Sequence, residues 1–232
     1  MNLIGLHGFL GTSKDFEGLT SLRKFDHIWT PNLFLEDQRL LQKGFNDFCD
    51  QALSELQKQG FVKNNVLVGY SLGGRLALHL ALKAPELFER VILISTHPGI
   101  FCEEEILQRR MWEGLWCKKM SRESFEQWTS EWLSQPLFQG DSPRDLKEPD
   151  FDLQTLICGM TLFSNTRHEF DWESMIKFPS GLTWVHGELD LKFGKIHQKI
   201  KSERPQDQLI SIPDRGHRLL GPQSQTWLSQ IF

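Results

Sequence analysis

One serine in this chain lies in a setting that typically activates a hydroxyl group. Ser71 is the central residue of Gly69-Tyr70-Ser71-Leu72-Gly73, a G-x-S-x-G sequence between the apolar run 66–68 and a helical pattern. Strand, tight turn and helix in this order are typical of a nucleophile elbow, which exposes the serine Oγ at a helix N-terminus. The alternative is a structural serine in a nucleotide-binding turn, but neither G-x-G-x-x-G nor G-x-x-x-x-G-K-[ST] occurs here.

A serine is a poor nucleophile or base at neutral pH unless a histidine takes its proton and an acid orients that histidine. His217, in an R-G-H sequence, and Asp190, in a G-E-L-D sequence, each follow a predicted strand late in the chain. The carboxyl ends of parallel strands meet at one edge of a sheet, so we predict a catalytic triad of Ser71, Asp190 and His217. Glu188 and Asp214 are the alternative acids.

The remaining histidines have structural interpretations. His7 directly follows a predicted strand, and we expect it to be structural rather than catalytic. Five others are assigned to strands, helices or the region between them: His79, His97, His168, His186 and His197; His27 begins the predicted strand 27–29. The strand before His7-Gly8 suits a loop that supplies one N–H group of an oxyanion hole, here that of Phe9, and the elbow would supply the second from Leu72.

The elements that must position these residues are predicted from apolar spacing and from turn residues. Short apolar runs predict strands over 3–6, 27–29, 66–68, 91–94, 182–186 and 208–212. Helical spacing predicts helices over 12–19, 43–59, 72–84, 193–201 and 221–232. Strands that alternate with helices predict a parallel sheet with helices on both faces.

The character of the sequence changes between residues 98 and 174. Strand signals are lacking there, whereas helical patterns and several tryptophans are present. We predict a helical lid over 98–174, and a core formed by 1–97 and 175–232. Ordinary packing of small helices accounts for most of the tryptophans, and a lid of this kind can gate a site and exclude water.

Bulk properties exclude several classes of protein. The chain has 232 residues and a net charge of −4, which gives no electrostatic case for binding nucleic acid. No apolar run reaches the ~20 residues that a membrane helix needs, and the N-terminus does not have the pattern of a signal peptide. Four cysteines without C-x-x-C spacing argue against zinc and a disulfide framework. We therefore expect a cytoplasmic monomer or homodimer that needs no cofactor or metal.

Several stretches together support a resemblance to a known family. They are L-H-G-F-L-G at 6–11, V-G-Y-S-L-G-G-R at 68–75, E-W-L-S-Q-P-L-F at 131–138, G-E-L-D-L-K-F at 187–193 and R-G-H at 215–217. The whole chain resembles the α/β-hydrolase superfamily and, more narrowly, the 2-succinyl-6-hydroxy-2,4-cyclohexadiene-1-carboxylate (SHCHC) synthase family of menaquinone biosynthesis. The resemblance implies an α/β-hydrolase fold with a helical lid after the strand that follows the elbow helix. The first strands of the fuller fold are expected to be missing.

The resemblance also implies a reaction. Members of the family are lyases that eliminate pyruvate from 2-succinyl-5-enolpyruvyl-6-hydroxy-3-cyclohexene-1-carboxylate. By resemblance, Ser71 would act as a base activated by His217, without an acyl-enzyme. The N–H groups of Phe9 and Leu72 would hold the developing oxyanion.

The implied substrate is a small anion with several carboxylates, so cationic binding residues are expected. By resemblance these are Arg75, Arg109 in an E-x-x-x-R setting, and Lys192, with the aromatic residues Tyr70 and Trp132 near the pocket. Arg110 is the alternative to Arg109. The structural alternatives are a salt bridge at Arg75, a solvated Arg109 and a Trp132 that belongs to the core of the lid.

Two other functions are compatible with the same residues. A carboxylic-ester or thioester hydrolase would use the same triad through an acyl-enzyme, because fold does not decide function. A non-catalytic binding protein on this scaffold is disfavoured, since it has no need to keep Ser71, Asp190 and His217 together. The density of cationic groups in the pocket, and activity on neutral esters, would discriminate the lyase from the hydrolase.

Overall fold

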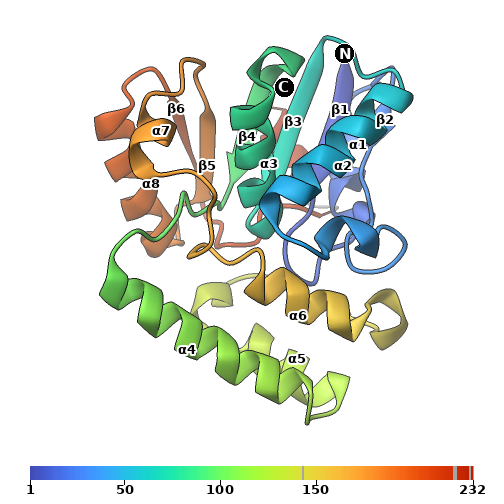
Figure 1. The fold of residues 1–232 in the computed structure, drawn as a ribbon, viewed down its shortest axis with the longest axis vertical. Coiled ribbons are helices and arrows are strands. Elements are labelled where there is room, and N and C mark those ends of the chain that lie inside the picture. The colour runs from blue at the N-terminus through green and yellow to red at the C-terminus, as the bar shows by residue number, and fades with distance from the viewer. Residues whose placement is uncertain (143, 222–223, 230, 232) are drawn as a thin grey trace.

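The computed structural model describes residues 1–142, 144–221, 224–229 and 231. Within these residues, six parallel strands form one sheet in the order β2-β1-β3-β4-β5-β6 (Figure 1). The strands are β1 (Asn2–Leu6), β2 (Ile28–Trp29), β3 (Asn65–Tyr70), β4 (Phe88–Ile94), β5 (Thr183–Gly187) and β6 (Gln208–Ile212). The α-helices are α1 (Glu17–Leu22), α2 (Phe45–Lys58), α3 (Leu72–Lys83), α4 (Glu103–Met120), α5 (Phe125–Leu133), α6 (Leu153–Thr161), α7 (Trp172–Ile176), α8 (Leu191–Glu203) and α9 (Gln225–Leu228). The predicted parallel α/β architecture is confirmed.

Apolar residues on both faces of the sheet account for the continuous apolar runs in the central strands. All residues of β1 and β3 are buried. Leu67 of β3 belongs to the core that includes residues of α2, α3 and α8, whereas its neighbours Val66 and Val68 belong to a second core that includes residues of α1 and α9. Successive side chains of a strand point to opposite faces, so helices cover both sides of the sheet.

The carboxyl ends of the strands carry the predicted catalytic residues. Ser71 follows β3 directly, Asp190 follows β5 and His217 follows β6. Because every pairing in the sheet is parallel, these three strands end at the same edge. The topology therefore gathers segments that are up to 146 residues apart in the chain (217 − 71).

The helices between β4 and β5 form a separate group. In Figure 1, α4, α5 and α6 lie together below the sheet, whereas α7 lies beside α8. Ser124 forms a capping box at the start of α5 with Gln127, and Trp116 and Trp132 join α4 to α5 with ring centroids 4.9 Å apart. The limits of the lid at 98 and 174 stay a prediction. No helix among the described residues combines the length and the apolar character needed to cross a membrane.

The C-terminal helix is shorter than predicted from spacing. A helix over 221–232 was expected, but α9 comprises four residues, Gln225–Leu228. Gly221 has a φ of +130°, which is incompatible with a right-handed helix, so the helix does not include the predicted first residue. Residues 222–223, 230 and 232 of the predicted helix lie outside the described residues.

Candidate active site

The turn between β3 and α3 holds Ser71 in a strained conformation. Its φ of +53° and ψ of −108° lie outside the usual regions for a residue with a side chain. The flanking glycines are required by close backbone approach. A Cβ at Gly73 would lie 2.0 Å from the carbonyl oxygen of Leu6, and one at Gly69 would lie 2.5 Å from that of Gly73. The local geometry is that of a nucleophile elbow, with Ser71 at the N-cap of α3.

Asp190 and His217 form a buried hydrogen-bonded pair. Nδ1 of His217 lies 2.6 Å from Oδ2 of Asp190, and the two residues are only 2% and 6% exposed. Oδ1 of Asp190 accepts a hydrogen bond from the N–H of Phe193 (3.2 Å), because Asp190 is the N-cap of α8. An ionised Asp190 accepts at both oxygens, so the Nδ1 proton stays on His217 and leaves Nε2 available to take a proton from a hydroxyl group.

The alternative acids have other surroundings. Glu188 accepts a hydrogen bond from the N–H of Asp214 (3.4 Å), and both residues are exposed. Among the described contacts, the carboxylate that bonds to the ring of His217 is that of Asp190.

Two backbone N–H groups are available for an oxyanion. Phe9 and Leu72 both line the cavity that contains Ser71, and neither N–H donates to an acceptor within the described residues. His7 fixes the loop that carries Phe9. Its Nδ1 donates to the carbonyl of Gly8 (2.9 Å), and its Nε2 accepts from the N–H of Leu33 (3.0 Å). These bonds use both ring nitrogens, which supports the structural interpretation of His7.

One cavity of about 1020 Å³ brings together all of the predicted site residues. The predicted members of its lining are Ser71, Asp190, His217, Phe9, Leu72, Arg75, Arg109, Lys192, Tyr70 and Trp132. The lining is built from the carboxyl edge of the sheet and from lid segments that include α4 and α5. This placement shows that the residues share one site and leaves their roles as predictions.

Arg75 is the most buried cation of this lining. It is 9% exposed, and its Nε donates to the carbonyl of Phe163 (2.9 Å). Among the described residues, no carboxylate lies within 4 Å of the guanidinium. Burial and the nearby charge of Arg109 lower the pKa of Arg75. The predicted alternative, a salt bridge at Arg75, is therefore not found in the described part of the chain, and a bound anion would stabilise the charge.

Arg109 and Lys192 reach the cavity from different elements. The Nε of Arg109 lies 2.6 Å from Oε1 of Glu113, and its guanidinium lies over the ring of Trp112 at 4.3 Å. Arg110, the alternative to Arg109, is exposed and outside the lining. Lys192 has no ion pair within the described residues. The side chain of Lys192 is exposed; partial desolvation and the charge of Arg109 lower its pKa, whereas the carboxylates of Asp190 and Glu105 in the same lining raise it.

Aromatic rings surround His217. The ring centroid of His217 lies 4.7 Å from that of Phe193 and 5.8 Å from those of Tyr70 and Phe138. Burial raises the pKa of Tyr70, so its phenol is neutral at physiological pH. Trp132 packs against Phe9 at 4.9 Å. These apolar walls limit water around the ring nitrogen that would handle the proton.

Sequence reasoning missed three residues of this site. His97 and Asn165 line the cavity, and Glu113 holds Arg109 while accepting a hydrogen bond from Ser164 Oγ (2.7 Å). The position of His97 just after β4 was a usable signal, because ligands bind at the carboxyl ends of such strands. Asn165 and Glu113 lie in the lid, and no local motif marks them.

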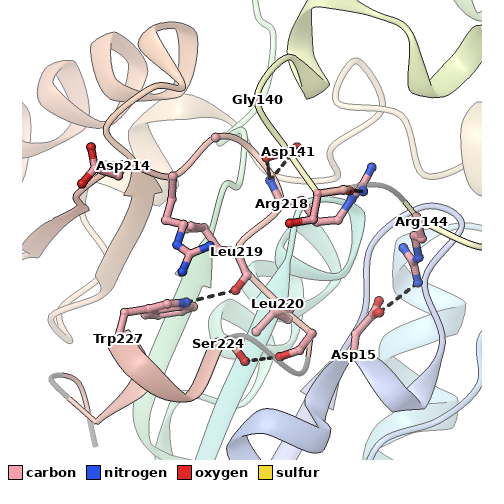
Figure 2. Close-up of a pocket in the computed structure, with 14 residues that line it drawn as sticks. Asp15, Gly140, Asp141, Arg144, Asp214, Arg218, Leu219, Leu220, Ser224 and Trp227 are labelled. Carbon is pink, nitrogen blue, oxygen red and sulfur yellow. Dashed lines mark hydrogen bonds and ion pairs between the residues drawn. The ribbon is translucent and has the colours of Figure 1, made fainter.

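A second, smaller cavity of about 340 Å³ lies beside the loop of His217 (Figure 2). Polar contacts join Asp141, Ser142 and Arg144 to the core there, and the carbonyl of Ser142 accepts from Nη1 of Arg218 (2.7 Å). Arg144 pairs with Asp15 (2.9 Å), and Asp141 accepts from the N–H of Arg218 (3.0 Å). None of the triad residues lines this cavity. These contacts hold Asp141, Ser142 and Arg144 against Asp15 and against the loop that carries His217.

Comparison with known proteins places this geometry in a family. The family model described as alpha/beta hydrolase fold matches residues 2–220. A putative SHCHC synthase of Haemophilus influenzae is 28% identical over 230 residues, which are 94% of this chain and 90% of the relative. The SHCHC synthase of Enterobacter sp. strain 638 is 27% identical over 234 residues, 93% of this chain and 84% of the relative.

Solved structures share the fold. The structure described as MenH from S. aureus has a TM-score of 0.87 at 22% identity, with coverage of 100% of this chain and 91% of the other. A carboxylesterase structure from Nitrososphaera gargenis has a TM-score of 0.73 at 14% identity, with coverage of 94% and 83%. The resemblance predicted from the motifs is confirmed. The chain belongs to the α/β-hydrolase fold family.

Proposed function

We propose that this chain is a carbon–oxygen lyase of menaquinone biosynthesis. It would eliminate pyruvate from 2-succinyl-5-enolpyruvyl-6-hydroxy-3-cyclohexene-1-carboxylate and yield SHCHC. Relatives that cover more than nine-tenths of this chain carry the name SHCHC synthase, which supports the proposal. A substrate with several carboxylates needs a cationic site beside the reacting group.

The main support for the proposal is the set of positively charged side chains that line the cavity of Ser71. Arg75 is buried in the same cavity as Ser71 and has no carboxylate within 4 Å among the described residues. Arg109 and Lys192 line that cavity as well. A site for a neutral ester has no use for a buried, unpaired guanidinium, because burying a charge without a partner is costly. Binding a multiply charged anion would offset the cost of burying the charge of Arg75.

The proposed mechanism is base catalysis rather than acyl transfer. His217, oriented by Asp190, takes the hydroxyl proton of Ser71, and the Ser71 oxygen removes a proton from the carbon next to the succinyl carbonyl. The N–H groups of Phe9 and Leu72 hold the negative charge that develops on the carbonyl oxygen. The electron pair of the enolate then returns to the ring, and the ring double bond shifts toward the carbon that bears the enolpyruvyl group. The bond from that carbon to the enolpyruvyl oxygen breaks. The released enolate takes up a proton and becomes pyruvate.

The second candidate is a carboxylic-ester or thioester hydrolase. It is favoured by one observation, the fold shared with a carboxylesterase structure at a TM-score of 0.73. In that case Ser71 would attack the ester carbonyl, and the same N–H groups would hold the tetrahedral oxyanion. Arg75 and Lys192 would then be structural charges.

Steady-state kinetics on two substrates separate the candidates. We expect kcat/KM for pyruvate release from the enolpyruvyl substrate to exceed kcat/KM for cleavage of a short neutral acyl ester by about 10³-fold or more, because the cations favour only the anion. The Ser71→Ala protein is the control for both assays. Ser71-dependent ester cleavage without pyruvate release would assign the chain to the hydrolases.

A further inference from the structure

The loop after β4 carries a histidine, His97, into the cavity that contains Ser71. The hydrogen bonds that hold this loop include those from Ser95 Oγ to the carbonyl of His217 (2.8 Å), from His197 Nε2 to the carbonyl of Thr96 (2.9 Å) and from the N–H of Ile100 to the carbonyl of Asn165 (2.7 Å). The partners come from the loop of the triad histidine, from α8 and from the segment after α6. The imidazole of His97 is therefore presented to the cavity by a fixed backbone.

The hydrogen bonds of His97 determine which ring nitrogen carries the proton. The N–H of Gly99 donates to Nδ1 of His97 (3.1 Å). A backbone amide only donates, so Nδ1 carries no hydrogen and the proton of the neutral ring lies on Nε2. Burial, with the positive charges of Lys192, Arg75 and Arg109, lowers the pKa of His97 to about 3, which keeps the ring neutral. Nε2–H thus remains a donor, and it has no acceptor among the described residues.

We infer that His97 is a specificity-determining residue whose Nε2–H donates a hydrogen bond to a carboxylate oxygen of the substrate, beside the charges of Arg75, Arg109 and Lys192. The inference rests on the proposed function, because that substrate supplies the carboxylates. A flexible cation attracts an anion from many directions. A ring held by its own Nδ1 bond donates in one direction, so His97 would select where the carboxylate lies.

Two variants separate the hydrogen bond from the packing of the ring. His97→Phe keeps an aromatic ring next to Phe193, whose centroid lies 6.3 Å away, but removes the N–H. His97→Gln loses the ring but places an amide N–H close to the former Nε2 position. We expect His97→Phe to raise KM for pyruvate release about 10- to 100-fold, with kcat within about threefold of wild type, since a hydrogen bond to a charged group is lost. His97→Gln should return KM to within about threefold of wild type. Equal KM values for wild type and His97→Phe, or a failure of His97→Gln to rescue, would overturn the inference.

A binding measurement distinguishes failure of this inference from failure of the proposed function. Calorimetric titration with succinate, a simple dicarboxylate, requires no turnover. Weaker binding to His97→Phe than to wild type and His97→Gln, without any pyruvate release by wild type, would support the inference and reject the proposed function. If wild type releases pyruvate but binds succinate as tightly as His97→Phe does, the proposed function would be supported and the inference about His97 would be rejected.

Discussion

The two ring nitrogens of His217 have separate surroundings. Nδ1 bonds to buried Asp190 at 2.6 Å, whereas the ring lines the cavity that contains Ser71. We predict that His217→Ala lowers kcat by about 10³-fold or more, because the serine proton would have no acceptor. His27→Ala, at an exposed histidine, is the matched control and should keep full activity. Steady-state assays combined with circular dichroism test this, and an active, folded His217→Ala protein would reject the triad.

The proposed choice between an anionic and a neutral substrate depends on the charge of Arg75. We predict that Arg75→Gln raises KM for the anionic enolpyruvyl substrate about 10- to 100-fold, because a charge-assisted hydrogen bond in a buried site is lost. KM for a neutral acyl ester should change by no more than about twofold. Parallel kinetics on both substrates provide the measurement. Equal effects on the two KM values would mean that Arg75 supports the fold and does not bind a carboxylate.

At the level of elements, a buried carboxylate of helix α4 contacts the segment that follows α6, within the predicted lid. Glu113, 4% exposed, pairs with Arg109 on the same helix and accepts from Ser164 after α6. Glu113 therefore fixes the side chain of Arg109 relative to the cavity.

We predict that Glu113→Gln raises KM for the anionic substrate about three- to tenfold and leaves kcat within about twofold, because Arg109 loses its orienting charge. The control is Glu123→Gln, which breaks a surface ion pair with Lys119 (3.6 Å) that lies outside the lining of the cavity. That variant should behave as wild type, since exposed ion pairs contribute little. The same KM for all three proteins would show that Arg109 needs no such support.

The strands were predictable because each central strand is buried on both faces and is therefore a continuous apolar run. The central strand β3 is longer than the apolar run 66–68 because it includes Asn65 and Tyr70, whereas β6, an edge strand with exposed residues, has the predicted limits 208–212. Asn65 is a buried polar residue whose side chain bonds to the carbonyl of Leu87, a contact that spacing alone does not indicate. The end of the chain is less predictable, since Gly221 has a φ of +130° that its sequence context does not indicate, and α9 is limited to Gln225–Leu228.

The site was predictable where a local motif constrains the backbone. Glycines around Ser71 and the residues after β5 and β6 mark the elbow and the two loops in the sequence itself. Glu113 and Asn165 carry no such mark, because their positions depend on how the lid helices pack on the core. The sequence places His97 only at a strand end, and the role that we propose for it depends on the contact between Nδ1 and the N–H of Gly99.

At the scale of the whole molecule, buried neutral histidines make stability depend on pH. His197 is 1% exposed, and burial lowers its pKa to about 4 from the ordinary 6.5. Between these values the unfolded chain binds more protons than the native one, so the free energy of unfolding rises with pH and is lost on acidification.

The quantity to follow is the difference in the free energy of unfolding between wild type and His197→Gln. We predict that this difference (wild type minus variant) falls by about 1.4 kcal/mol per pH unit as pH decreases from about 6 to about 4.5. Glutamine can keep the donor to the carbonyl of Thr96 but does not titrate. Urea denaturation at several pH values gives this difference. A difference that does not vary with pH would mean that His197 is protonated in the native state.

The proposal that Ser71 acts as a base, in a lyase, is tested most directly by quenched single-turnover reactions with the enolpyruvyl substrate. Pyruvate and the mass of the intact protein would be measured in the same samples. We predict one pyruvate per substrate consumed, no mass increase on the protein at any time, and no pyruvate with Ser71→Ala. An acyl group on Ser71, or consumption of substrate without pyruvate, would contradict the account and favour a hydrolase.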